Sequence, residues 1–251
     1  MTMRGHWGLL VTELRNSMRH LRVVLASIFS GLLLLAGLAM PAQATPGPHI
    51  TNSDRQHIKD FFKTYEVPAQ NWAPLLRTWE SGQPWDSNKG GDPVSVETRD
   101  KSDETVQISR FADGSVKVTT VEKPVVELKS GEVTPYASVQ GCSVYRTSYS
   151  ATFSGCGESN QWGNVYLAFN ANFESWAGGG KIDWVGNQTG TCWGLSCNQP
   201  TWDPQKTSSD YAGPAMQRIH MWVTQTVGVP FSWDTWVQLN VNGSGGWATS
   251  S

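Results

Sequence analysis

The sequence predicts a mainly β protein: a C-terminal antiparallel β-sandwich or barrel with two disulfides, preceded by a short helical pair and a β-hairpin. Three observations lead to this fold class. Apolar and polar residues alternate along several stretches of residues 141–251, helical spacing occurs in residues 45–92, and all four cysteines of the 251-residue chain lie after residue 140. A period of two is typical of half-buried strands, whereas a period near 3.6 indicates amphipathic helices.

The first 44 residues have the features of a secretory signal peptide. Arg19 and Arg22 precede an apolar stretch at residues 23–39, and Ala42 and Ala44 occupy the small-residue positions before a cleavage point. A membrane anchor is disfavoured because this stretch is shorter than the roughly 20 residues that span a bilayer. We therefore predict a secreted protein without stable membrane insertion after cleavage. We also predict that translation starts at Met18, where a compact basic segment begins.

Charge and cysteine content divide the rest of the chain. The predicted organisation is a helical segment at residues 45–92, a hairpin and linker at 93–140, and a Trp-rich β domain at 141–251. The whole chain has 19 basic and 21 acidic residues, and the signal removes four and one of these, which leaves 15 and 20 and a net charge of −5. This charge gives no electrostatic reason to expect nucleic acid as a partner.

Two amphipathic helices are predicted in the helical segment. The first has Ser53 as its N-cap and Gln56 as the partner of a capping box, and its apolar stripe consists of Ile58, Phe61, Phe62 and Tyr65. The second covers residues 71–82, and its apolar face consists of Trp72, Leu75, Leu76 and Trp79. We expect these aromatic residues to form a small helix–helix core.

A β-hairpin is predicted around the dipeptide Asp113-Gly114. β-branched residues stand on both sides of it, at positions that include Val106, Ile108, Val116 and Val118. The dipeptide favours the positive φ angles of a tight turn. Because an isolated hairpin is marginally stable in water, it must pack on another element.

Residues 60–123 resemble a module of uncharacterised secreted actinobacterial proteins. The resemblance rests on a helical pair that leads to "WDS" at residues 85–87, and on the "DGS" hairpin at residues 113–115. In that family the module precedes variable β-rich C-terminal domains. The resemblance implies a secreted protein of Gram-positive origin, and it supplies no catalytic residue.

Alternating strands are predicted throughout residues 141–251. The stretch 164–174 places Val165, Leu167 and Phe169 on one side and Asn170 and Asn172 on the other. Further strands fall within residues 181–193, 215–228 and 235–250, separated by turns rich in Gly, Asn and Pro. Short strands with this spacing are typical of an antiparallel sandwich or barrel.

The four cysteines are predicted to form two disulfides, Cys142–Cys156 and Cys192–Cys197. An export signal and an even number of cysteines favour disulfides, and sequence proximity selects this pairing from the three that are possible. A zinc site would need two further ligands at suitable spacing, and a redox motif would need C-x-x-C beside a βαβ unit. Neither pattern is present, so we expect no metal and no cofactor.

Catalytic candidates are few. His220 is the only histidine on a predicted strand, and it lacks a recognisable nucleophile motif nearby. Glycoside hydrolysis needs two facing carboxylates, for which Glu174 and Asp183 are candidates across the turn at residues 175–181. The other carboxylates of the β region are Glu158, Asp203, Asp210 and Asp234. These residues keep an extracellular hydrolase open as an alternative function.

The tryptophan content carries the main functional hypothesis. Nine of the 13 tryptophans lie in residues 141–251, a region with ten charged residues. An exposed indole offers a flat apolar surface with a polar edge, which suits stacking on sugar rings or on a protein. The predicted surface tryptophans are Trp193, Trp202, Trp222 and Trp236, with Asn170, Asn172 and Gln238 as hydrogen-bonding partners.

We therefore expect a secreted, non-enzymatic binding or interaction protein, with an extracellular glycan or cell-envelope component as its partner. An extracellular hydrolase is one alternative, and a secreted toxin or bacteriocin-like protein is another. Exposed indole rings in a flat row would favour binding, whereas a deep pocket with two carboxylates about 5 to 10 Å apart would favour hydrolysis.

Overall fold

The structure is a computed structural model that describes residues 50–124, 126–128, 141–225 and 231–251. The predicted signal peptide and the predicted start at Met18 lie outside the described residues. Residues 46–251 cluster as one unit. The prediction of a mainly β fold with two antiparallel sheets is confirmed.

Two helices form the N-terminal part of the described chain, α2 (Asn52–Thr64) and α3 (Ala69–Glu80), followed by the 3-10 helix η1 (Asp86–Asn88). The N-cap of α2 is Thr51, whose hydroxyl accepts from the Asp54 amide at 3.1 Å while the Asp54 carboxylate accepts from the Thr51 amide at 2.8 Å. The capping box therefore begins at Thr51, two residues before the predicted N-cap Ser53. The predicted stripe holds, since Ile58, Phe61 and Phe62 are buried.

Sheet A has eight strands and contains the predicted hairpin. Its strands are β1 (Ser95–Asp100), β2 (Glu104–Arg110), β3 (Val116–Glu122), β4 (Val126–Leu128), β5 (Ser143–Arg146), β6 (Ser150–Gln161), β7 (Val165–Trp176) and β8 (Gly179–Cys192). Strands β2 and β3 pair across the predicted turn, where Gly114 has a φ of 85°. β1 adds a third strand to this hairpin. β3 also pairs with β6, so the sheet continues across residue 141, where the sequence predicted a boundary.

Sheet B has five strands from the last third of the chain. They are β9 (Ser196–Cys197), β10 (Thr201–Trp202), β11 (Ala215–Gln225), β12 (Phe231–Asn242) and β13 (Gly245–Ser250). β11 and β12 are paired over eleven residues, from Ala215 opposite Val241 to Gln225 opposite Phe231. β13 extends the sheet beyond β12, and β9 and β10 pair with the other edge of β11.

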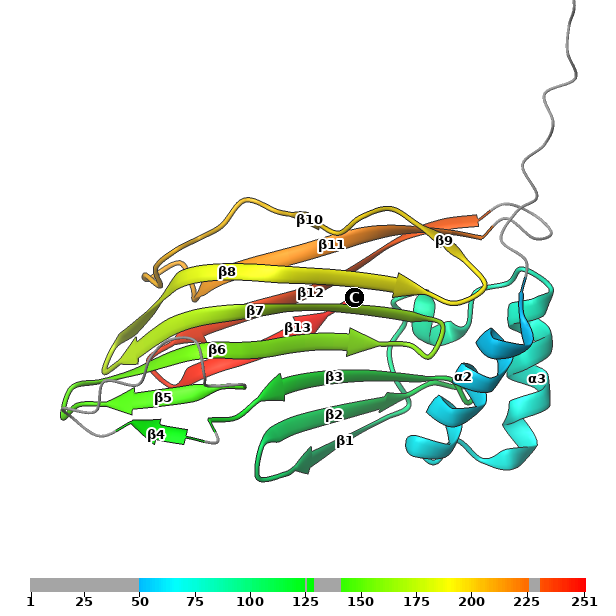
Figure 1. Cartoon of the computed structure of the whole chain (residues 1–251), viewed down its shortest axis with the longest axis horizontal. Coiled ribbons are helices and arrows are strands. Elements are labelled where there is room, and N and C mark those ends of the chain that lie inside the picture. Colours follow the sequence, from blue (N-terminus) through cyan, green and yellow to red (C-terminus); the bar gives the residue numbers. More distant parts are fainter. Residues whose placement is uncertain (1–49, 125, 129–140, 226–230) are drawn as a thin grey trace, which may run out of the picture. The chain divides into compact units, whose positions relative to one another are not determined.

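The two sheets face each other across the apolar core, with β12 and β13 behind β6 and β7 in the view of Figure 1. Alternation decides which side chains enter it. Val165, Leu167 and Phe169 of β7 and Ile219 and Met221 of β11 are buried. Backbone hydrogen bonds also join β8 to the segment at residues 206–209. The Ile182 amide donates to the Thr207 carbonyl at 2.9 Å, and the Ser209 amide donates to the Gly180 carbonyl at 2.8 Å.

The helical pair closes one end of the two sheets, beside the β6–β7 and β8–β9 turns (Figure 1). The Gln225 side chain at the end of β11 donates to the Trp79 carbonyl at 3.0 Å, and the Ser87 amide of η1 donates to Ser115 after the hairpin turn at 3.0 Å. Trp79 and Trp85 are fully buried, so their rings belong to the core that links helices and sheets.

Both predicted disulfides are present, Cys142–Cys156 and Cys192–Cys197. The first joins the start of β5 to β6, and the second closes the loop between β8 and β9. The second loop carries Trp193 and Leu195, and Leu195 is buried in the core. The Cys-Trp-Gly-Leu-Ser-Cys stretch is therefore a staple that holds one end of the sandwich.

Candidate ligand-binding face

The predicted ligand-binding residues do not converge on one place. Asn170 and Asn172 lie on the outward side of sheet A, whereas Trp222, Trp236 and Gln238 lie on the outward side of sheet B. The two remaining tryptophans, Trp193 and Trp202, are half-buried and pack against other side chains of the protein.

Trp193 and Trp202 are engaged by the protein itself. The Trp193 ring stacks on His57 of α2, with ring centroids 3.6 Å apart and planes inclined by 13°. Burial lowers the pKa of His57, which favours a neutral imidazole in this stack. Trp202 points into the sandwich and meets Phe169 edge-on at 5.4 Å. Both indoles therefore contribute to packing, as large aromatic side chains usually do.

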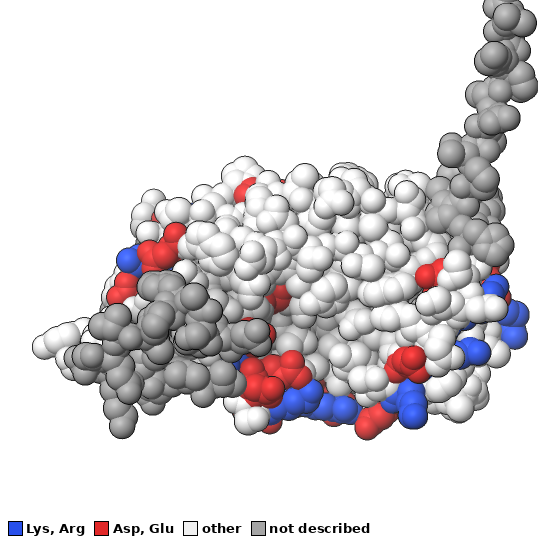
Figure 2. All heavy atoms as spheres, viewed as in Figure 1, with Lys and Arg blue, Asp and Glu red and all other residues white. Residues whose placement is uncertain are grey.

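Face A is the outward side of β6, β7 and β8, and it is turned toward the viewer in Figure 2, where few charged side chains appear over these strands. Asn170 and Asn172 serve a β-bulge there, between Phe153 and Cys156. Asn172 accepts from the Gly155 amide at 2.8 Å, and Asn170 donates to the Gly155 carbonyl at 3.2 Å. Their amides thus satisfy backbone groups that the bulge removes from the ladder.

Glu174 and Asp183 lie on either side of one cation. The Lys181 ammonium is 3.1 Å from a carboxylate oxygen of each residue. The hydrogen bond and charge of Lys181 lower the pKa of Glu174. Glycoside hydrolysis needs one carboxyl that stays protonated to act as general acid. This ion-paired arrangement does not favour that role.

Face B is the outward side of sheet B. It consists of Met216, Arg218, His220 and Trp222 on β11, Asp234, Trp236, Gln238 and Asn240 on β12, Trp247 and Thr249 on β13, and the flanking residues Thr201, Asp203 and Ser251. The alternating inward residues Ile219, Met221 and Val223 are fully buried. Burial of one row on each strand fixes which residues point outward.

Three tryptophans cross face B in a diagonal row. Trp222 on β11 and Trp247 on β13 are 51% and 38% exposed, and Trp236 on β12 is half-buried. The register places Trp222 opposite Asp234 and Trp247 opposite Asn240. With ordinary strand spacing, the Cα atoms are about 8 Å apart from Trp222 to Trp236 and about 14 Å from Trp236 to Trp247. Alternation in the sequence predicted that Trp222 and Trp236 lie on the surface, and it did not select Trp247.

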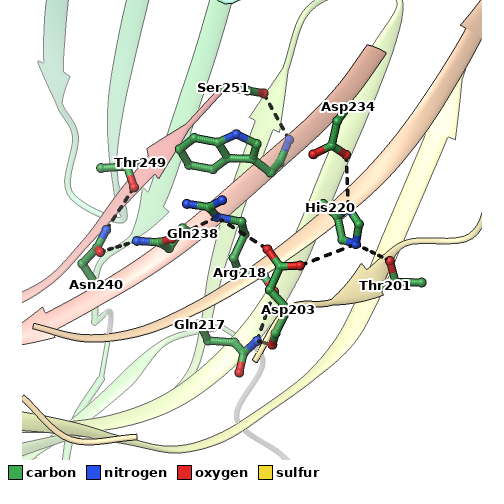
Figure 3. Close-up of polar contacts among 11 residues, drawn as sticks. Thr201, Asp203, Gln217, Arg218, His220, Asp234, Gln238, Asn240, Thr249 and Ser251 are labelled. Atoms are coloured by element: carbon green, nitrogen blue, oxygen red, sulfur yellow. Dashed lines mark hydrogen bonds and ion pairs between the residues drawn. The ribbon is translucent and has the colours of Figure 1, made fainter. Parts of the chain in front are cut away.

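A polar chain crosses face B from β11 through β12 to β13 (Figure 3). Arg218 donates to the Gln238 side-chain oxygen at 3.0 Å, and the Gln238 amide donates to Asn240 at 2.6 Å. Asn240 in turn donates to the Thr249 hydroxyl at 3.1 Å. Because Gln238 and Asn240 are buried, their amides fix the positions of neighbouring side chains, which differs from the direct ligand contact predicted for Gln238.

Arg218 connects this chain to the central tryptophan. Its guanidinium carbon lies 4.1 Å from the centre of the Trp236 ring, a cation–π contact. An Asp203 oxygen lies 3.8 Å from the Arg218 Nε atom. The indole of Trp236 is therefore held in one orientation before any ligand arrives.

His220 lies at the other end of the polar cluster (Figure 3). Its Nε2 atom is 2.7 Å from the Thr201 hydroxyl, and its Nδ1 atom is 3.1 Å from an Asp234 oxygen. This order of hydroxyl, imidazole and carboxylate matches a nucleophile, a base and an orienting group. However, Asp203 also lies 3.5 Å from Nε2, and the three side chains stand on an open strand surface. The contacts thus hold the ring without isolating a nucleophile.

Trp184 is a further exposed indole that sequence reasoning did not select. It is 44% exposed and lies opposite Asn172, on face A. Asn172 pairs with Trp184 and Phe173 pairs with Ile182, so β8 has one extra residue at this bulge. Simple alternation from the buried Ile182 would therefore turn Trp184 inward, whereas the bulge turns it outward.

In the part of the chain that the structure describes, no group of three or more His, Cys, Asp or Glu residues is placed to hold a metal ion. Among the same residues, no helix is long and apolar enough to cross a membrane.

In comparisons with known proteins, no family model, no curated protein and no solved structure matches the chain.

Proposed function

We propose that the chain is a secreted, non-enzymatic binding protein that recognises a glycan or cell-envelope polymer through face B. The observation that carries the proposal is the diagonal row of Trp222, Trp236 and Trp247 beside a connected polar chain. Indoles supply flat apolar area at low entropic cost, and the buried amides of the polar chain hold the neighbouring side chains in place. The exposed hydroxyls of Thr201 and Thr249 supply hydrogen-bonding groups to a ligand. This combination suits a ligand whose rings have apolar faces and hydroxyl rims, as sugars have.

Secretion is supported by the sequence of the first 44 residues and by two disulfides, which persist in oxidising compartments. The resemblance to secreted actinobacterial proteins agrees with this location. The excess of acidic residues argues against nucleic acid as the ligand.

The hydrolase alternative receives less support. Its two carboxylates are held by Lys181, and the His220 cluster has Asp203 against the nitrogen that would have to serve as base. The toxin alternative predicts killing of indicator strains by the purified protein, and no contact in the described residues bears on it.

A pull-down with peptidoglycan, chitin, cellulose and xylan, followed by tryptophan fluorescence with soluble fragments, tests the proposal. Wild-type protein should be retained by at least one polymer, and Trp222→Ala should lower its affinity about tenfold, which corresponds to about 1.4 kcal/mol. The matched control is Tyr211→Ala, because Tyr211 is a fully exposed aromatic residue outside face B. Equal loss in both variants, or retention by none of the polymers, would contradict the proposal.

A further inference from the structure

Face A carries an exposed indole, Trp184, that lies against the backbone of its own sheet. A Cβ atom on Gly186 would overlap the six-membered ring of Trp184, so the ring lies directly over the Gly186 backbone. One side of the indole is thus supported by the sheet, and the side chain remains 44% exposed. A ring held flat in this way needs no reorganisation to stack on a ligand.

The surroundings of Trp184 favour an uncharged partner. The neighbouring side chains of β7 are Asn170 and Asn172, and both amides are fixed by the Gly155 backbone. The charges near this part of the sheet are the ion-paired group of Glu174, Lys181 and Asp183 and the Glu122 carboxylate, which accepts from the Gly157 amide opposite Asn170. Because carboxylates outnumber the one ammonium here, a polyanion would be repelled, whereas a neutral polymer would not.

Faces A and B point away from each other, because each strand turns its alternate side chains into the shared core. Stacked sheets lie about 10 Å apart, and the side chains of both outer surfaces add to this separation. One extended ligand therefore cannot lie on Trp184 and on the face-B tryptophans at the same time. If both faces are occupied, the protein must bind two separate ligand chains.

We propose that Trp184 is a second platform for a neutral glycan, so that one protein molecule joins two strands of the polymer that face B binds. This inference rests on the proposed function. The Gly186 position is part of the platform, because any side chain there displaces the indole. Multivalent attachment of this kind raises the apparent affinity for a polymer above that of either face alone.

The experiment compares wild type with Trp184→Ala, Gly186→Ala and the control Tyr211→Ala, after thermal melting has shown that each variant is folded. Isothermal titration with chitin and cellulose oligosaccharides measures stoichiometry, and light scattering with hydroxyethyl cellulose and soluble chitin measures cross-linking. Polygalacturonate serves as the anionic polymer. The expected stoichiometry is two oligosaccharides per wild-type protein and one per Trp184→Ala or Gly186→Ala protein. Scattering from the neutral polymers should fall at least fivefold in both variants.

Five outcomes separate the two proposals. Two sites and undiminished scattering in Trp184→Ala would overturn the second platform and leave face B intact. A single site in wild type that persists in Trp184→Ala would do the same, whereas a single site that Trp184→Ala abolishes would overturn binding by face B. Scattering by polygalacturonate equal to that by the neutral polymers would overturn the assignment to an uncharged ligand. Absence of binding to every oligosaccharide and polymer by wild type would overturn both proposals.

Discussion

The two outer faces of the sandwich are built on the same alternation, yet they differ in what they present. Face A has one exposed indole, fixed asparagine amides and a single ion-paired group, and the side shown in Figure 2 has few charges over β6, β7 and β8. Face B has three indoles and a connected set of charged and amide side chains. The inward rows of both sheets consist mainly of aliphatic and aromatic residues, so the outward rows distinguish the two surfaces.

The largest expected effect is the loss of both exposed indoles of face B. Trp222→Ala with Trp247→Ala should lower affinity for the retained oligosaccharide about a hundredfold, since each truncation of an exposed anchor costs about 1.4 kcal/mol. Fluorescence titration measures it, with Trp184→Ala as the matched single-indole control on face A. If the double variant binds the oligosaccharide as tightly as wild type does, the exposed indoles of face B do not contribute to binding.

The second prediction concerns Glu158, which lies in the core between the two sheets. Glu158 is fully buried on the inner side of β6, neither carboxyl oxygen has a hydrogen-bond partner, and burial raises its pKa, with the Glu122 charge acting in the same direction. The unfolded chain releases this proton near its ordinary pKa of about 4.3, whereas the folded chain retains it. The free energy of unfolding contributed by this group therefore falls as pH rises above that value.

Glu158→Gln removes that proton and keeps the side-chain shape. It should stabilise the protein by about 1 to 2 kcal/mol at pH 8, the common scale for one buried substitution, and have little effect at pH 4. Thermal unfolding across this pH range is the measurement. A stability difference that does not grow with pH would show that Glu158 is already ionised in the folded chain.

Arg218 gives a smaller effect that is specific to face B. Lysine at this position keeps the charge but loses the planar stack on Trp236 and the forked donors. Arg218→Lys should weaken face-B binding about fivefold, which corresponds to about 1 kcal/mol, with unchanged stoichiometry. The control is Arg110→Lys on β2, far from both faces in sequence. Unaltered affinity in Arg218→Lys would mean that the orientation of Trp236 does not contribute.

The smallest effect is expected at the bulge of face A. Asn172→Ala leaves the part-buried Gly155 amide without its side-chain partner, so the free energy of unfolding should fall by about 0.5 kcal/mol. Face-B affinity should not change, because Asn172 lies on the opposite surface. A change in face-B affinity equal to that of Arg218→Lys would indicate that the two faces are coupled through the core.

Alternation and cysteine pairing made the sheets and the disulfides predictable from sequence. The pairing of β3 with β6 was not, because contacts between residues 40 positions apart leave no local pattern. Among the candidate site residues, Trp222 and Trp236 followed from parity. Trp193 and Trp202 did not, since their partners His57 and Phe169 come from other elements.

Trp184 and Trp247 show a second limit of sequence reasoning. A bulge shifts the register before Trp184, and Trp247 belongs to a short edge strand that begins with two glycines. The roles of Asn170 and Asn172 were missed for the same reason: the bulge that they satisfy is a property of two paired strands and not of either sequence alone.

The most direct test of face B follows the indole N–H resonances by NMR as a soluble oligosaccharide of the retained polymer is added. The account predicts that the signals of Trp222, Trp236 and Trp247 shift with a common saturation curve, while those of the buried Trp79, Trp85 and Trp162 stay in place. Binding that leaves the three face-B signals unmoved would contradict it.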